Sequence, residues 1–142
     1  MPVPIRTQIA SAIAQSLREV LNRDDLPPVL VERTRRPEFG DYSTSVCLRL
    51  AREAGMPPMD LAQQVIAHLP PAPFIGRAEP AHPGYINFWL DDGWLARQVD
   101  AILEAGESFG AISVGGGQRV QVEFVSANPT GPITIGSARN AV

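Results

Sequence analysis

The stretch Gly84-Tyr85-Ile86-Asn87-Phe88-Trp89-Leu90 carries the clearest secondary-structure signal in the sequence. Its apolar and polar or amphipathic side chains alternate, which is the period of a β-strand with one buried face. We expect Ile86, Phe88 and Leu90 to point into a core, and Tyr85, Asn87 and Trp89 to point to the opposite face. Taken alone, the pattern favours an opposite face that covers a second apolar layer beneath a helix.

Helices and shorter strands are predicted around this strand. Apolar residues at helical spacing predict helices over about 5–22, 43–54, 62–69 and 91–106, and short runs at 29–34 and 74–79 predict further strands. Asp91 is the expected N-cap of the last helix, and the expected inward stripe of that helix is Leu95, Val99, Ile102 and Leu103. Residues 1–106 are therefore predicted to form an α+β domain, a small, mainly antiparallel sheet packed with helices.

The C-terminal part changes in character. Residues 107–118 are rich in Gly and Ser and predict a linker. Residues 119–142 read as a strand at Val120–Val125, a Pro/Gly turn and a helix start near Gly136. This is the incomplete start of an α/β nucleotide-binding domain, a layout that suits phosphates.

Composition excludes several classes of protein. The 142 residues carry 12 basic and 15 acidic side chains, a net charge of −3, so the chain is not a polybasic nucleic-acid arm. No apolar run approaches the roughly 20 residues that cross a bilayer, and no targeting signal is evident, so we expect a cytoplasmic protein without membrane contact. The single cysteine, Cys47, excludes a disulfide scaffold. His68 and His82 have no partners at ligand spacing, so no metal site is expected.

One basic cluster stands out. Arg33, Arg35 and Arg36 follow one another closely. Such a cluster is usually a solvated face, but beside an RNA-binding surface it could contact phosphates.

The run from Glu123 to Ile133, which reads Glu-Phe-Val-Ser-Ala-Asn-Pro-Thr-Gly-Pro-Ile, resembles the first segment of the catalytic domain of arginyl-tRNA synthetases, which are class I aminoacyl-tRNA synthetases. Phe39-Gly40-Asp41-Tyr42 and Gly84-Tyr85-Ile86-Asn87-Phe88 are similar to segments of that family's N-terminal additional domain. The resemblance covers essentially the whole chain. It implies that the full-length protein attaches arginine to its tRNA, with ATP and Mg²⁺ as the nucleotide cofactor.

The resemblance also implies roles for individual residues. Ser126 and Asn128 match positions that line the amino-acid site, and Gly136 matches the glycine against which adenine packs. Tyr85 and Asn87 match positions that contact the tRNA D-loop at the elbow, where an aromatic ring and an amide can stack and read an unpaired base. For these two residues the resemblance shifts the preference to RNA contact, and Trp89 stays undecided.

One departure bears on catalysis. The family has a His-x-Gly-His motif, and this chain has Thr134-Ile135-Gly136-Ser137. Thr and Ser donate hydrogen bonds but cannot carry positive charge toward ATP phosphates, so losing both histidines is expected to be disabling. We therefore expect a tRNA-binding portion of a synthetase or derived paralogue, with no catalytic residue and no bound cofactor of its own. The alternative is a degenerate synthetase-derived protein that acts through protein–protein contacts. A natural short protein and a piece of a longer enzyme both stay open.

Overall fold

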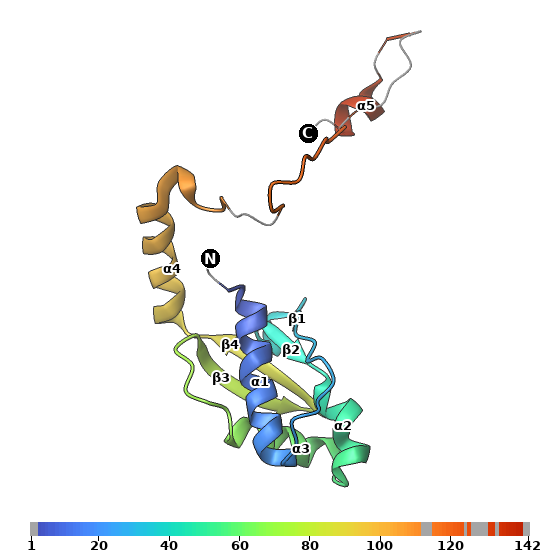
Figure 1. Ribbon diagram of the computed structural model, residues 1–142, viewed down its shortest axis with the longest axis vertical. Helices are drawn as coiled ribbons and strands as arrows, with labels where there is room; N and C mark the ends of the chain where they lie inside the picture. Colours follow the sequence, from blue (N-terminus) through green and yellow to red (C-terminus); the bar gives the residue numbers. More distant parts are fainter. Residues whose placement is uncertain (1–2, 112–114, 124, 126–130, 133, 141–142) are drawn as a thin grey trace. The chain divides into compact units, whose positions relative to one another are not determined.

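The computed structural model describes residues 3–111, 115–123, 125, 131–132 and 134–140 (Figure 1). The chain divides into two compact units, Met1–Phe109 and Gly110–Val142, and each is considered by itself. The first unit contains the helices α1 (Ile5–Leu21), α2 (Val46–Ala54), α3 (Pro58–Ala67) and α4 (Asp92–Ala105), and the strands β1 (Glu32–Arg33), β2 (Tyr42–Thr44), β3 (Ile75–Ala81) and β4 (Tyr85–Leu90). Short 3-10 helices occur at Pro37–Phe39 (η1) and Gly106–Ser108 (η2).

The strands form one antiparallel sheet in the order β1-β2-β4-β3. The strand predicted at Gly84–Leu90 is confirmed as β4, and it lies between β2 and β3. The α+β prediction, a small antiparallel sheet packed with helices, is confirmed.

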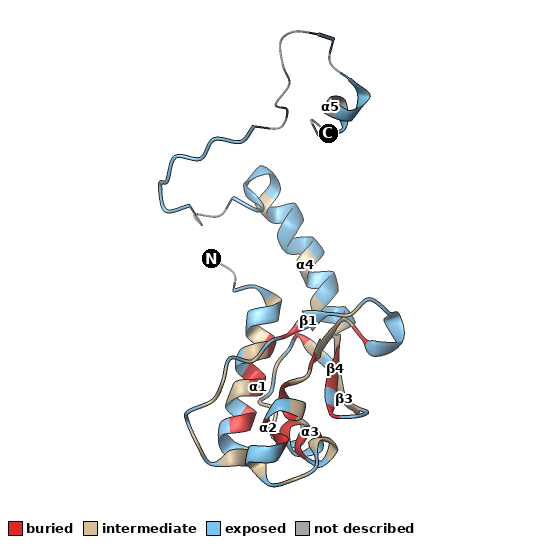
Figure 2. Cartoon of the chain, turned by 90° about the vertical axis from the view of Figure 1, so that its right-hand side faces the viewer, coloured by how far each residue is buried: buried red, intermediate tan, exposed pale blue. Residues whose placement is uncertain are grey.

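The core lies between one face of the sheet and the first three helices (Figure 2). Ile86 and Phe88 of β4 are fully buried, as the alternation predicted. They pack with buried apolar residues from α1, α2 and α3, namely Ile9, Ile13, Leu17, Val46, Cys47, Leu50, Leu61, Ala62 and Val65. Apolar residues at helical spacing therefore form the buried faces of these three helices. Tyr85, Asn87 and Trp89 belong to the other face of β4.

Strand β2 was not predicted. The apolar spacing predicts a single helix over 43–54, but α2 begins only at Val46. Residues Tyr42–Thr44 instead pair with both β1 and β4, and the Thr44 hydroxyl donates a hydrogen bond of 2.7 Å to the Leu30 carbonyl oxygen. Pairing with strands distant in sequence outweighs the local helical spacing here.

The Gly-Asp-Tyr segment attaches the preceding loop to β4. The Asp41 backbone N–H donates to the Phe88 carbonyl oxygen at 2.8 Å, and Asp41 Oδ2 accepts from the Leu90 backbone N–H at 2.9 Å. Gly40 makes this close approach possible, because its φ of 78° and ψ of −163° belong to a region that essentially only glycine adopts. The contacts that Gly40 and Asp41 make with β4 therefore explain why these residue types occur in the segment.

Other boundaries shift by a few residues. The strand predicted at 29–34 is reduced to Glu32–Arg33. The strand predicted at 74–79 extends to Ala81, with an irregularity in register between Ile75 and Arg77. The helix predicted around 62–69 begins earlier, at Pro58, where a proline is well tolerated.

Helix α4 differs most from its prediction. Its N-cap is confirmed, since Asp91 Oδ1 accepts from the Trp94 backbone N–H at 2.7 Å. Its expected inward stripe is wrong: the four residues are exposed, with Leu95 at 38%, Val99 at 55%, Ile102 at 40% and Leu103 at 73%. Within the described residues, α4 contacts the core through Trp94. The Trp94 ring packs edge-on against the Phe74 ring, with the two ring centroids 6.4 Å apart. Helical spacing identifies an apolar face but not the surface that covers it.

In the second unit, α5 spans Ile135–Asn140, in agreement with the helix start expected near Gly136. The strand predicted at 120–125 is absent from the described residues 120–123 and 125. A strand needs a pairing partner to be stable, and no pairing is formed by these residues. In the described part of the chain, no helix combines the length and the apolar character needed to cross a membrane.

Candidate functional site

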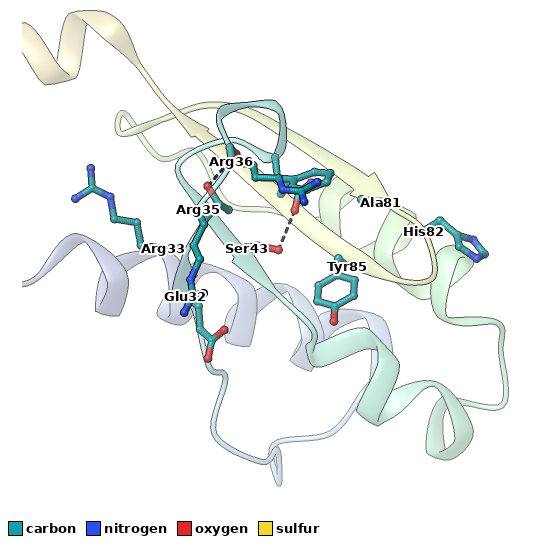
Figure 3. Close-up of a pocket in the computed structure, with 11 residues that line it drawn as sticks. Glu32, Arg33, Arg35, Arg36, Ser43, Ala81, His82 and Tyr85 are labelled. Atoms are coloured by element: carbon teal, nitrogen blue, oxygen red, sulfur yellow. Dashed lines mark hydrogen bonds between the residues drawn. The ribbon is translucent and has the colours of Figure 1, made fainter.

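A groove of about 390 Å³ is formed by the first unit (Figure 3). One side is the segment from β1 to η1, and the other is the end of the β3–β4 hairpin, with β2 and β4 contributing between them. We call it the Tyr85 groove, and its lining residues are Glu32, Arg33, Thr34, Arg35, Arg36, Phe39, Ser43, Ala81, His82, Tyr85 and Asn87.

Tyr85 and Asn87, the two residues singled out in the sequence, both line this groove. Tyr85 is 40% exposed, and it also borders a second, smaller hollow of about 100 Å³ beside Leu30 and Ser45. Because loop and strand residues surround its ring, Tyr85 does not cover an apolar layer beneath a helix. That alternative from the sequence analysis is therefore wrong for Tyr85.

Asn87 is only 5% exposed, and its amide is oriented by the neighbouring strand. Ser43 is its cross-strand partner in β2, and the Ser43 hydroxyl donates to Asn87 Oδ1 at 2.8 Å. This bond uses one of the two lone pairs of the amide oxygen. Within the described residues the amide NH₂ group makes no hydrogen bond, so it can donate to an acceptor on a ligand in the groove.

The basic cluster lies on the segment that forms one side of this groove. Arg33, Arg35 and Arg36 are exposed and belong to the segment opposite His82 and Tyr85 (Figure 3). Among the described residues, the ion pair recorded for this cluster joins Arg36 Nη1 to Glu38 Oε1 at a long 4.0 Å. Exposed pairs of this kind contribute little, so the three guanidinium groups are available to an anionic partner.

Six groove residues are not identified as site residues from the sequence: Glu32, Thr34, Phe39, Ser43, Ala81 and His82. Ser43 was assigned to a helix, Phe39 to a turn, and His82 was considered only as a metal ligand. His82 lies at the groove because Ala81 pairs with Tyr85 at the end of the hairpin. The described residues include no group of three His, Cys, Asp or Glu that could hold a metal ion.

Trp89 has a different environment from Tyr85. The Arg77 guanidinium lies over its ring, with Cζ 3.8 Å from the ring centroid. The backbone of Gly40 lies against the ring carbons, since a Cβ built on Gly40 would be 2.9 Å from Trp89 Cδ2. Trp89 is therefore not a lining residue of the Tyr85 groove.

Cys47 is not a nucleophile of this site. It is buried in the core, and desolvation raises the pKa of its thiol from 9.0 to about 12. The thiol therefore stays protonated at neutral pH.

The residues matched to the catalytic domain fall in the second unit. Ser126 and Asn128 lie outside the described residues. Thr134 directly precedes α5, and Gly136 and Ser137 belong to the first turn of that helix. Their roles stay predictions.

Comparisons with known proteins agree with the resemblance. The model of the arginyl-tRNA synthetase N-terminal domain matches residues 7–90, a range that contains the whole Tyr85 groove. The arginine–tRNA ligase of Dechloromonas aromatica is 41% identical over 99% of this chain and 24% of its own length. That of Geobacillus kaustophilus is 43% identical over 94% of this chain and 25% of its own length. The chain thus spans about a quarter of the length of these relatives.

Solved structures of arginyl-tRNA synthetases also align with this chain. The Thermus thermophilus arginyl-tRNA synthetase aligns with a TM-score of 0.57 and 33% identity, over 66% of this chain and 15% of that one. The Plasmodium falciparum arginyl-tRNA synthetase aligns with a TM-score of 0.60 over 67% of this chain and 17% of that one, and at 12% identity it supports the fold alone.

Proposed function

The chain belongs to the arginyl-tRNA synthetase family through its N-terminal domain, and we propose that this domain binds tRNA by taking an unpaired D-loop nucleotide at the elbow into the Tyr85 groove. The base stacks on the Tyr85 ring, and the Asn87 NH₂ group donates to an acceptor on the base edge. Arg33, Arg35 and Arg36 contact the phosphates next to that nucleotide. The proposed place of action is the cytoplasm.

The observation that supports this proposal is the meeting of three kinds of side chain in one groove: an exposed ring, an oriented amide donor and the guanidinium groups of Arg35 and Arg36. Arg33 belongs to the same segment, but its side chain is directed away from the groove (Figure 3). Unpaired RNA is commonly recognised by stacking on aromatic rings and by hydrogen bonds to base edges. Phosphate contacts fix the position of the chain on the RNA, and base contacts supply selectivity.

The net charge of −3 means that attraction to RNA is local. Replacing Arg33, Arg35 and Arg36 by Gln is expected to weaken tRNA binding and to reduce the slope of log K against log salt. Three phosphate contacts correspond to a change in slope of about 2. Titration of a tRNA that accepts arginine at several salt concentrations measures this slope.

A matched control removes the same charge elsewhere. Arg6, Arg52 and Arg97 are exposed and are not among the groove residues. Their replacement by Gln is expected to change the slope far less. Equal slopes for the two triple variants would mean that the Arg cluster makes no localised contact with phosphates.

In a full-length family member, this contact would position tRNA while the catalytic domain activates arginine with ATP and Mg²⁺ and transfers it to the tRNA. We infer that the present chain does not activate arginine by itself, because Thr134 and Ser137 cannot supply the positive charge of the family's histidines. Arginine-dependent exchange of pyrophosphate into ATP by the purified chain would refute this inference.

A protein-binding role is the second candidate, and the exposed apolar stripe of α4 favours it. The tRNA titration at low salt separates the two. Binding that depends on the Tyr85 groove supports the first function. If no tRNA binding is detected, the protein-binding role is favoured.

A further inference from the structure

A second feature lies beyond the Tyr85 groove on the same strand pair. Arg77 Cζ is 3.8 Å from the centroid of the Trp89 ring, and Arg77 Nη1 is 3.2 Å from Glu79 Oε1. In the β3–β4 register, Arg77 is opposite Trp89, and Glu79 is opposite the groove residue Asn87. The Arg77–Trp89 pair is thus the next cross-strand pair on the face that carries Asn87.

The outer surface of this pair is a guanidinium plane rather than an indole ring. Arg77 covers the Trp89 ring, and Gly40 backbone lies against the ring carbons. The Arg77 side chain is 55% exposed. The Trp89 ring orients the guanidinium, and the exposed Glu79 pair adds a weaker restraint, so Arg77 loses less conformational freedom when a ligand binds than a free Arg side chain would.

We propose that Arg77, held over Trp89, is a second stacking site for RNA and takes the base of a nucleotide one or two positions from the one in the Tyr85 groove. This inference rests on the proposed function. Alternate residues of a β-strand are about 7 Å apart, so Trp89 is about 14 Å from Tyr85. An extended RNA chain of one or two nucleotides can bridge this distance. Guanidinium planes stack on unpaired bases as aromatic rings do.

The charge environment indicates stacking rather than a phosphate contact. Glu79 neutralises part of the Arg77 charge and would repel a phosphate placed beside it. A base presents no net charge, so it can rest on the guanidinium without competing for the ion pair. Arg77 therefore differs from the three Arg residues of the groove, which have no such close carboxylate partner recorded in the described chain.

Two substitutions separate the contribution of the planar Arg77 guanidinium group to tRNA binding from that of its positive charge. Arg77→Ala removes both, and Arg77→Lys keeps the charge but removes the plane. Each is expected to weaken the binding of a tRNA that accepts arginine by about fivefold to tenfold, and Arg77→Lys is expected to leave the salt slope unchanged. Arg52→Ala, an exposed Arg on α2, is the control and should bind like the unchanged chain.

The outcomes distinguish this inference from the function on which it rests. If Arg77→Lys binds like the unchanged chain, Arg77 does not stack a base, whatever Arg77→Ala does. If both Arg77 variants bind normally while Tyr85→Ala binds weakly, the second site is refuted and the groove stands. If Tyr85→Ala also binds normally, both proposals are refuted.

Discussion

Gly40→Ala is expected to destabilise the first unit by about 3 kcal/mol or more. A Cβ at this position would lie 2.5 Å from the Phe88 carbonyl oxygen and 2.9 Å from Trp89 Cδ2. Neither the backbone of the central strand nor the covered ring can move away cheaply. The backbone conformation adds its own cost, because an L-residue rarely adopts the φ of 78° found here. Urea unfolding followed by circular dichroism measures the loss.

Gly55→Ala provides the matched control. Gly55 also has a positive φ, of 66°, but within the described residues no atom beyond its immediate chain neighbours lies within 4 Å of the position its Cβ would take. Only the conformational cost remains, about 1–2 kcal/mol. Equal losses for the two variants would mean that the loop before β2 does not approach β4 as closely as described.

Tyr85→Ala is expected to weaken tRNA binding by about fivefold to 150-fold, which corresponds to the roughly 1–3 kcal/mol that a stacked base contributes. The folded chain should tolerate the change, because the ring is exposed at the groove and lies outside the core. Fluorescence titration of a tRNA that accepts arginine, at fixed low salt, gives the ratio of affinities.

Tyr85→Phe is the control for this prediction. Among the described residues, no hydrogen bond is recorded for the Tyr85 hydroxyl, so removing it should leave affinity close to that of the unchanged chain. A Phe variant as weak as the Ala variant would mean that the hydroxyl, and not the ring, carries the contact.

The strand at the centre of the sheet was predictable because its environment is two-sided. Ile86 and Phe88 lie on the core face, and the opposite face carries polar or amphipathic side chains, so the residue types alternate from Tyr85 to Leu90 although Asn87 is itself buried. That alternation is visible without any partner strand. Asp91 was equally readable, because a cap acts on the backbone three residues away. Both are local effects.

The groove was not predictable, because its parts are distant in sequence. Tyr85 and Arg35 are brought to the same groove only by strand pairing. In that ladder Glu32 is opposite Ser43, and Ser43 is opposite Asn87. The strand that joins them, β2, has three residues, too few to show a period. The resemblance singled out Tyr85 and Asn87, and the fold adds Ser43 from β2 and Phe39 from η1 and brings the segment of the Arg cluster beside them.

The apolar stripe of α4 shows a second limit of prediction from the sequence. Leu95, Val99 and Ile102 have the spacing of a buried helix face, and in the first unit they are exposed. Spacing reports that a face is apolar. What covers that face depends on surfaces that the spacing does not encode.

The central claim is that the Tyr85 groove is where tRNA meets this domain. Titrating the isotope-labelled chain with a tRNA that accepts arginine, and following its amide resonances by NMR, tests this directly. We predict changes at the Asn87 side-chain NH₂ group and at the backbone of Tyr85 and Arg35, with no change at Gly55 beyond the end of α2. Resonances of the groove that stay fixed while others shift, or a spectrum unchanged by saturating tRNA, would contradict the account.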